Sequence, residues 1–166
     1  MALKEALISE FEQEMANTRK TLERAPTEKL GWKPHEKSFT LGELAAHMAE
    51  IPNWLVNTLD DDELNLKGPF TRNTPTAIEE ILAAFDANVA EAKKSLAKVD
   101  DAHFAKMWSL KVEDKQLFSM PRAAVARGMI MNHSVHHRGQ MTVYLRLLDI
   151  PVPAIYGPSA DEKSFF

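Results

Sequence analysis

Residues 132–148 read NHSVHHRGQMTVYLRLL, and this stretch decides how the chain is expected to fold. Its apolar positions repeat with the period of an α-helix. The same period places His133 and His137 on the face that should meet the core, in line with Tyr144. Side chains four residues apart on a helix lie about 5–6 Å apart, so the two imidazoles can reach one cation.

Three further segments carry the same helical period, and no segment has a clear strand pattern. Because each apolar stripe must be buried against another, the sequence predicts an all-α four-helix bundle, a single domain over residues 1–166. The first helix has an apolar stripe that includes Leu3, Phe11 and Leu22. Thr40 is the expected N-cap of the second helix, and TAIE at 76–79 (Thr76 with Glu79) has the form of a capping box before the third. Ser119 is the expected cap of a fourth helix that ends near Leu148.

The composition excludes several classes of site and partner. The chain has 166 residues, a net charge of −4 and no cysteine. Without cysteine there are no disulfides, thiolate metal sites or cysteine nucleophiles, so any metal must be bound by nitrogen or oxygen. Nucleic acid is not an expected partner, because phosphate binding needs a basic stripe. The chain shows no signal peptide and no apolar run long enough to span a bilayer, so we expect a cytoplasmic protein with no membrane partner.

A third histidine falls on the inward face of the second helix. His47 lies three residues after Leu44 and four before Ile51, both expected in the core. A buried imidazole whose nitrogens lack partners costs about 1–3 kcal/mol, so three of them would make an expensive core. A cation that accepts their lone pairs removes this cost. The pattern therefore predicts a divalent metal site formed by His47, His133 and His137, with at least one open coordination position, as in catalytic sites.

Other readings of these histidines remain open at this level. A lone inward histidine is commonly a hydrogen-bonded core residue, and His133 and His137 could each have such partners. The position after His133 is Ser134, so the glutamate of the His-Glu-x-x-His zinc proteases is missing. Di-iron bundles need inward glutamates, whereas the glutamates of the first helix lie mainly on its polar side and Glu79 is near a helix end. The general base is not identified.

Residues close to the predicted ligands are candidates for binding substrate or for supporting the ligands. Gln140 and Tyr144 share the inward side and could orient substrate or water, or simply complete the packing. Arg138 is expected to meet a neighbouring helix or an anionic group at the rim, and His136 faces about 100° away from His137, at the rim of the site. The remaining histidines, His35 and His103, are expected in surface loops.

Three fragments together resemble a known family. LGELAAHMAEIPNW (41–54), MNHSVHHRGQMTVYLRLLDIPVP (131–153) and YGPSADE (156–162) are similar in order and spacing to the DinB-like, or YfiT-like, metalloenzyme superfamily. The resemblance implies an up-down-down-up four-helix bundle, commonly a homodimer, that binds nickel or zinc through three histidines. Carried onto this chain, the ligands are His47, His133 and His137.

The resemblance implies an enzyme acting on a small molecule but does not fix the reaction. Many relatives are described only as metal-dependent hydrolases. Others transfer a low-molecular-weight thiol, such as bacillithiol or mycothiol, to electrophiles, and one branch isomerises maleylpyruvate with mycothiol. Some of those relatives have a carboxylate in place of one histidine, which this chain does not. The alternatives are a metal- or ligand-binding stress-response module without turnover, and a structural helical dimer with protonation-sensitive histidines.

Overall fold

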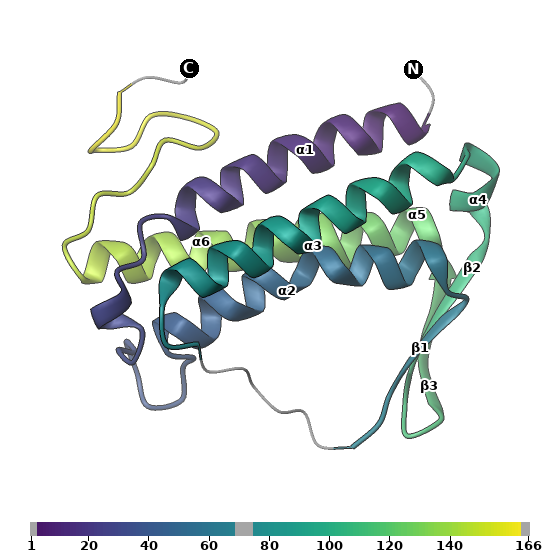
Figure 1. The fold of residues 1–166 in the computed structure, drawn as a ribbon, viewed down its shortest axis with the longest axis horizontal. Helices are drawn as coiled ribbons and strands as arrows, with labels where there is room; N and C mark the ends of the chain where they lie inside the picture. Colours follow the sequence, from purple (N-terminus) through teal and green to yellow (C-terminus); the bar gives the residue numbers. More distant parts are fainter. Residues whose placement is uncertain (1–2, 69–74, 164–166) are drawn as a thin grey trace.

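A computed structural model describes residues 3–68 and 75–163, and four long helical segments dominate it (Figure 1). The first and last segments run in one direction and the middle two run in the other, so the predicted up-down-down-up bundle is confirmed. The four segments are α1 (Leu3–Leu22), α2 (Leu41–Asp60), α3 (Ile78–Lys98) and a composite of α5 (Arg122–Val125), the π-helix η2 (Ala126–Met131) and α6 (Asn132–Leu147).

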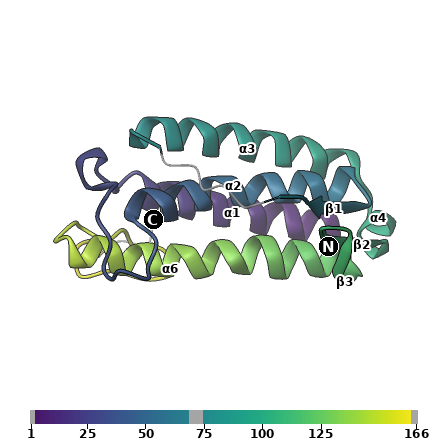
Figure 2. The same cartoon turned by 90° about the horizontal axis from the view of Figure 1, so that it is seen from below.

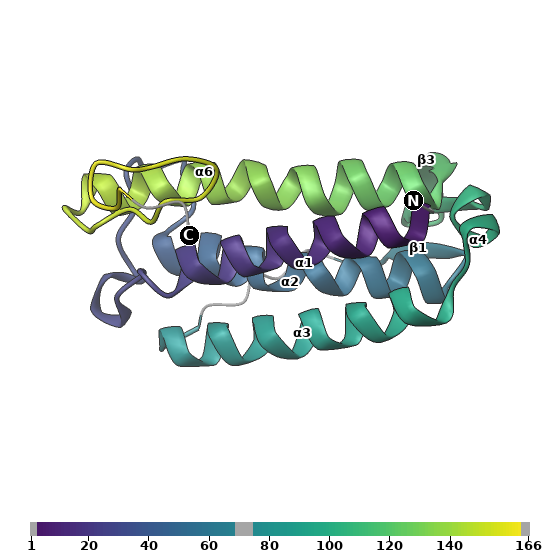
Figure 3. The ribbon, with the colours of Figure 1, turned by 90° about the horizontal axis from the view of Figure 1, so that it is seen from above.

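The four helices are not arranged in chain order. Helices α3 and α6 lie on opposite sides of the bundle, with α1 and α2 between them (Figures 2 and 3). Helix α2 therefore packs directly against α6, although more than 70 residues separate their ends in the sequence. This contact brings the histidine of the second helix toward the pair on the last one.

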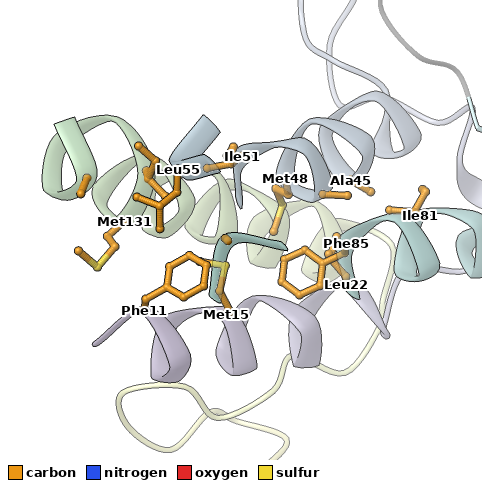
Figure 4. Packing of buried hydrophobic residues seen from close by; sticks show 14 of the residues in the cluster. Phe11, Met15, Leu22, Ala45, Met48, Ile51, Leu55, Ile81, Phe85 and Met131 are labelled. Carbon is orange, nitrogen blue, oxygen red and sulfur yellow. The ribbon is translucent and has the colours of Figure 1, made fainter. Parts of the chain in front are cut away.

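The core between the helices is apolar and draws on every long helix. Figure 4 shows Phe11 of α1, Met48 and Ile51 of α2, Phe85 of α3 and Met131 of η2 packed together. All five are almost fully buried. In the part of the chain that the structure describes, no helix is both long enough and apolar enough to cross a membrane.

The start signals predicted for the second and third helices have different outcomes. Thr40 is the N-cap of α2, as predicted; its side chain accepts a hydrogen bond from the Glu43 backbone, and the Glu43 carboxylate accepts one from the Thr40 backbone in return. The box assigned to Thr76 and Glu79 is wrong. Helix α3 begins one residue later than predicted, and Thr76 contacts the carboxylate of Glu80 instead.

A small sheet covers one end of the bundle, and the expectation that no strand is present is wrong. β1 pairs in parallel with β2, and β2 pairs antiparallel with β3. Ser119 lies within the third strand and caps no helix; the last helical segment begins at Arg122, after Pro121. The strands are β1 (Glu63–Leu66), β2 (Met107–Val112) and β3 (Lys115–Pro121).

Two short helical elements complete the described chain. η1 (Thr27–Lys29) follows α1, and α4 (Asp101–Ala105) joins α3 to the sheet. His103 lies in α4, half-buried, with Nε2 2.8 Å from the carbonyl oxygen of Leu59, so its predicted place in a surface loop is wrong. His35 is exposed outside any helix, as predicted.

Candidate metal centre

Three imidazole nitrogens converge between α2 and α6. The Nε2 atom of His133 lies 3.3 Å from Nε2 of His47 and 2.6 Å from Nε2 of His137. One ring nitrogen from each histidine falls within 4.8 Å of the other two. The structure thus brings together the three residues that the sequence predicts as metal ligands.

Local contacts help to set which ring nitrogen of His133 and of His137 faces the cluster. Nδ1 of His137 lies 2.7 Å from Oε1 of Gln140, so this nitrogen donates its hydrogen to the amide oxygen. His133 hydrogen-bonds the backbone of Met129, one turn earlier. In the neutral tautomer that the Gln140 contact selects, Nε2 of His137 presents a lone pair to the cluster.

The electrostatics favour neutral rings. Desolvation by burial lowers the pKa of both His133 and His137 below the ordinary value for histidine. Hydrogen bonds to Met129 and Gln140 oppose this shift only in part. Neutral imidazoles whose lone pairs face each other repel unless a proton or a cation lies between them, and here burial disfavours the extra proton.

The donor set fits a divalent transition metal. A tetrahedral ion with Zn–N bonds of about 2.0–2.1 Å holds its nitrogens about 3.3 Å apart, which is the His47–His133 separation. The Nε2 atoms of His133 and His137 are closer together than this, at 2.6 Å. Three neutral nitrogen ligands suit zinc and nickel and leave at least one coordination position for a small molecule.

Of the residues predicted to support the ligands, Gln140 and His136 lie near His137, whereas Tyr144 contacts the loop before α2. Gln140 holds His137 from the exposed side of α6 and does not fill the core. His136 is exposed at the rim, with its ring 4.8 Å from that of His137. The hydroxyl of Tyr144 donates to the carbonyl of Phe39 at 3.2 Å, so it anchors the loop before α2 and is not aimed at the ligands.

Arg138 belongs to a separate buried network. Its side chain is 3 % exposed and donates to Oε2 of Glu14 at 2.6 Å and to Oγ1 of Thr18 at 3.1 Å, both on α1. This is the neighbouring helix that the sequence analysis expects. Glu14 itself is buried and is the exception among the glutamates of the first helix, which lie mainly on its polar side as predicted. Tyr156 joins both groups, and burial together with Glu14 raises its pKa to about 12.

Glu50, an acidic residue near the centre, was not predicted from the sequence. Glu50 follows His47 by three residues, so both lie on one face of α2 and line the same cavity. Its side chain is half-buried, and desolvation raises the pKa of the carboxyl group above its ordinary value. The spacing from His47 was visible in the sequence, but only the packing of α2 shows that a cavity lies there.

A cavity of about 190 Å³ adjoins the histidine cluster on the side of His47. Its walls come from α2, from the π-helix η2 and from the sheet. Trp54 lines the cavity and also lies close to two of the predicted ligands, with its ring 6.0 Å from that of His47 and 5.6 Å from that of His133. The lining residues are His47, Glu50, Trp54, Thr58, Leu64, Leu66, Trp108, Leu110, Phe118, Val125, Met129 and Ile130.

The π-helix η2 immediately precedes the two ligands of α6. The N–H of Asn132 reaches the carbonyl of Arg127, five residues back, where an α-helix would use the fourth. This wider turn contains the cavity residues Met129 and Ile130 and ends two residues before the ligand His133. Single π-turns inside longer helices occur frequently at functional sites.

Comparisons with known proteins agree with this architecture. The model of the DinB family matches residues 1–164. A 47-residue segment is 45% identical to YrdA of Bacillus subtilis strain 168, described as uncharacterized; the match spans 28% of this chain and 28% of that protein.

Solved structures share the fold at low sequence identity. A DinB-like protein from Bacillus cereus ATCC 10987 superposes with a TM-score of 0.69 at 24% identity, over 92% of this chain and 97% of its own. The DinB-like protein YjoA from Bacillus subtilis gives 0.68 at 16% identity, over 89% and 95%. YfiT from Bacillus subtilis, described as a probable metal-dependent hydrolase with an unusual four-helix bundle topology, gives 0.66 at 16% identity, over 88% and 87%.

Proposed function

Because the chain belongs to the DinB family, we propose that it is a metal-dependent hydrolase whose divalent cation is bound by His47, His133 and His137. One observation carries the proposal: three ring nitrogens from two helices converge within 4.8 Å of one another. The description of YfiT as a probable metal-dependent hydrolase supports the same class of reaction.

The chemistry of the site suits hydrolysis of a small molecule. When bound, a divalent cation acts as a Lewis acid that lowers the pKa of a water ligand toward about 7. The protein keeps His137 oriented through Gln140, and it holds Glu50 one helical turn from His47, where its carboxylate can accept a proton. In the reaction, water gives its OH to the carbonyl carbon and its proton to the departing group.

We propose zinc or nickel as the metal. The three ligands are nitrogen donors, which suit both ions, and the chain has no thiolate to select a softer metal. Metal analysis of protein purified without a histidine tag identifies the ion directly. About one ion per chain is the expected result.

Transfer of a low-molecular-weight thiol is the second candidate. Three neutral ligands leave the full divalent charge available to stabilise a thiolate, and Glu50 can accept the thiol proton. The two reactions are distinguished by assaying ester and amide hydrolysis alongside conjugation of several thiols to electrophilic probes. Bound metal without turnover in either assay would instead indicate the non-catalytic binding module.

The variants that test the site compare two predicted ligands, one on α2 and one on α6, with a neighbouring histidine on α6. His133→Ala and His47→Ala should each lose stoichiometric metal and all metal-dependent turnover. His136→Ala is the matched control, because this histidine lies on α6 beside the ligands but faces solvent. Loss of metal in the control alone, or full metal content in His133→Ala and His47→Ala, would contradict the proposal.

Assembly, substrate and compartment remain predictions. We propose a homodimer, which sedimentation equilibrium of the untagged protein tests, and a small-molecule substrate and not nucleic acid. A cytoplasmic location is tested by fractionation of the source cells.

A further inference from the structure

The cavity beside His47 has walls from three separate parts of the fold. Leu64, Leu110 and Phe118 form one row across the three strands, because each pairs with the next in the sheet register. This row faces Trp54 of α2 and Ile130 of η2 across the cavity. The sheet therefore does more than cap the bundle, since it closes one side of the space next to the predicted metal site.

Two polar groups in the cavity wall already have hydrogen-bond partners within the protein. The hydroxyl of Thr58 donates to the carbonyl of Trp54 at 2.7 Å, and Nε1 of Trp108 donates to the carbonyl of Asn57 at 3.2 Å. Of the other polar side chains in the wall, His47 belongs to the histidine cluster, 3.3 Å from His133, and Glu50 carries the carboxylate that a ligand in the cavity would meet. Over residues 3–68 and 75–163, no lysine or arginine lines this cavity.

The volume of the cavity and the charge of its wall together limit which ligands can bind there. An engineered apolar cavity of about 150 Å³ binds benzene, so a cavity of about 190 Å³ accommodates one aromatic ring or a branched alkyl group of similar bulk. A negatively charged ligand would meet the carboxylate of Glu50 with no basic side chain to compensate, in surroundings where like charges repel strongly.

We infer that this cavity binds the apolar part of a neutral substrate, one aromatic ring or branched alkyl group, and that Glu50 excludes substrates that carry an anionic group into it. This inference rests on the proposed function, which places the reacting centre at His47, His133 and His137. It adds the substrate class: neutral esters or amides with a single compact apolar group.

The test compares two probes of nearly the same shape, phenylacetamide and phenylacetate. Their binding is measured by ligand-observed NMR at pH 8 on chelator-treated protein, because a carboxylate could otherwise bind the metal itself. We expect phenylacetamide to bind at least about tenfold more tightly than phenylacetate. In Glu50→Gln, the difference should fall to within about threefold. Equal affinities in the unmodified protein, or an unchanged difference in Glu50→Gln, would overturn the inference.

A second pair of variants tests the location. Leu110→Trp fills the cavity from the sheet and should weaken phenylacetamide binding at least about tenfold. Leu117→Trp is the control, because Leu117 lies on the adjacent strand, is exposed and does not line the cavity. If Leu110→Trp fails to fold, Leu64→Phe fills the same row from β1. Binding that survives the filled cavity would overturn the inference.

The outcomes separate this inference from the proposed function. Selective binding of phenylacetamide without metal-dependent turnover supports the cavity and contradicts the hydrolase. Metal-dependent hydrolysis that does not distinguish neutral from anionic phenyl substrates supports the hydrolase and contradicts the cavity inference. Both activities are measured on the same full-length, untagged protein.

Discussion

Oε1 of Gln140 lies 2.7 Å from Nδ1 of His137, one turn further along α6. This single contact fixes the orientation of the ring and leaves Nε2 directed at His133, 2.6 Å away. Ligand histidines in metal sites commonly donate their second N–H to such an oxygen, which makes the ring a better ligand. Gln140 is thus a positioning residue, and it lies on the exposed side of the helix.

Gln140→Ala should lower the affinity for the metal about 10–100-fold. The stability of the metal-free protein should barely change, because the side chain is exposed. Competition with a chromophoric chelator measures the affinity, and thermal unfolding in excess chelator measures the stability. Gln140→Glu keeps an oxygen at the same place and should bind metal nearly as tightly as the unmodified protein. Unchanged metal affinity in Gln140→Ala would show that His137 needs no such support.

Thr40 and Thr76 precede α2 and α3, and we expect their replacement by alanine to change the free energy of unfolding by different amounts. Thr40→Ala removes a capping side chain and should lower the free energy of unfolding by about 1 kcal/mol. Thr76→Ala should cost less than about 0.5 kcal/mol, because Thr76 precedes the cap and its hydroxyl contacts the exposed Glu80. Urea denaturation of both variants gives the comparison. A larger loss for Thr76→Ala would restore the capping box that the sequence suggested.

The helices and the histidine cluster could be predicted from the sequence because both depend on helical periodicity. The period alone places His133 and His137 on one face, and the residues around His47 place it inward. What the period cannot give is which helix packs beside which. The predicted three-histidine site assumed that the second and last helices are neighbours, and the structure packs α2 against α6.

The sheet could not be predicted, for reasons visible in its turn. Strands β2 and β3 are joined by Glu113 and Asp114, which both have positive φ, 49° and 64°. Such a turn is usually recognised in a sequence by Asn-Gly or Asp-Gly, but neither glycine nor asparagine occupies these two positions. Glu50 was missed for a related reason, since its importance comes from a cavity that the sheet closes.

The buried pair of Arg138 and Glu14 should dominate the stability of the contact between α6 and α1. Glu14→Ala leaves a buried guanidinium without its carboxylate and should cost about 3–5 kcal/mol. The double variant Glu14→Leu with Arg138→Met should recover much of that loss, because it removes both charges together. Equilibrium denaturation measures all three proteins.

An exposed ion pair provides the control for this prediction. Glu23→Ala breaks the ion pair between Glu23 and Arg19, two exposed side chains. The free energy of unfolding should fall by at most about 1 kcal/mol. Similar losses for Glu14→Ala and Glu23→Ala would mean that burial of the Arg138 pair contributes nothing beyond a surface contact.

Glu50 should make the metal-free protein less stable as pH rises. Desolvation raises the pKa of its carboxyl group in the folded state above the ordinary value of 4.5. The folded state therefore holds this proton more tightly than the unfolded chain does. The resulting stabilisation is fully present below pH 4.5 and is lost as pH rises through the folded pKa.

Glu50→Gln removes this dependence, so its effect on stability should change with pH. At pH 7 the variant should be more stable than the unmodified protein, by less than about 1 kcal/mol given the partial exposure of the side chain. At pH 4 the two proteins should have nearly equal stability. Denaturant titrations in chelator at both pH values measure the difference, with Glu36→Gln, at an exposed position before α2, as the control for removing a carboxylate. A Glu50→Gln protein that is less stable at pH 7 would mean that the carboxylate has a stabilising partner, and that a charge in the cavity is not what excludes anionic ligands.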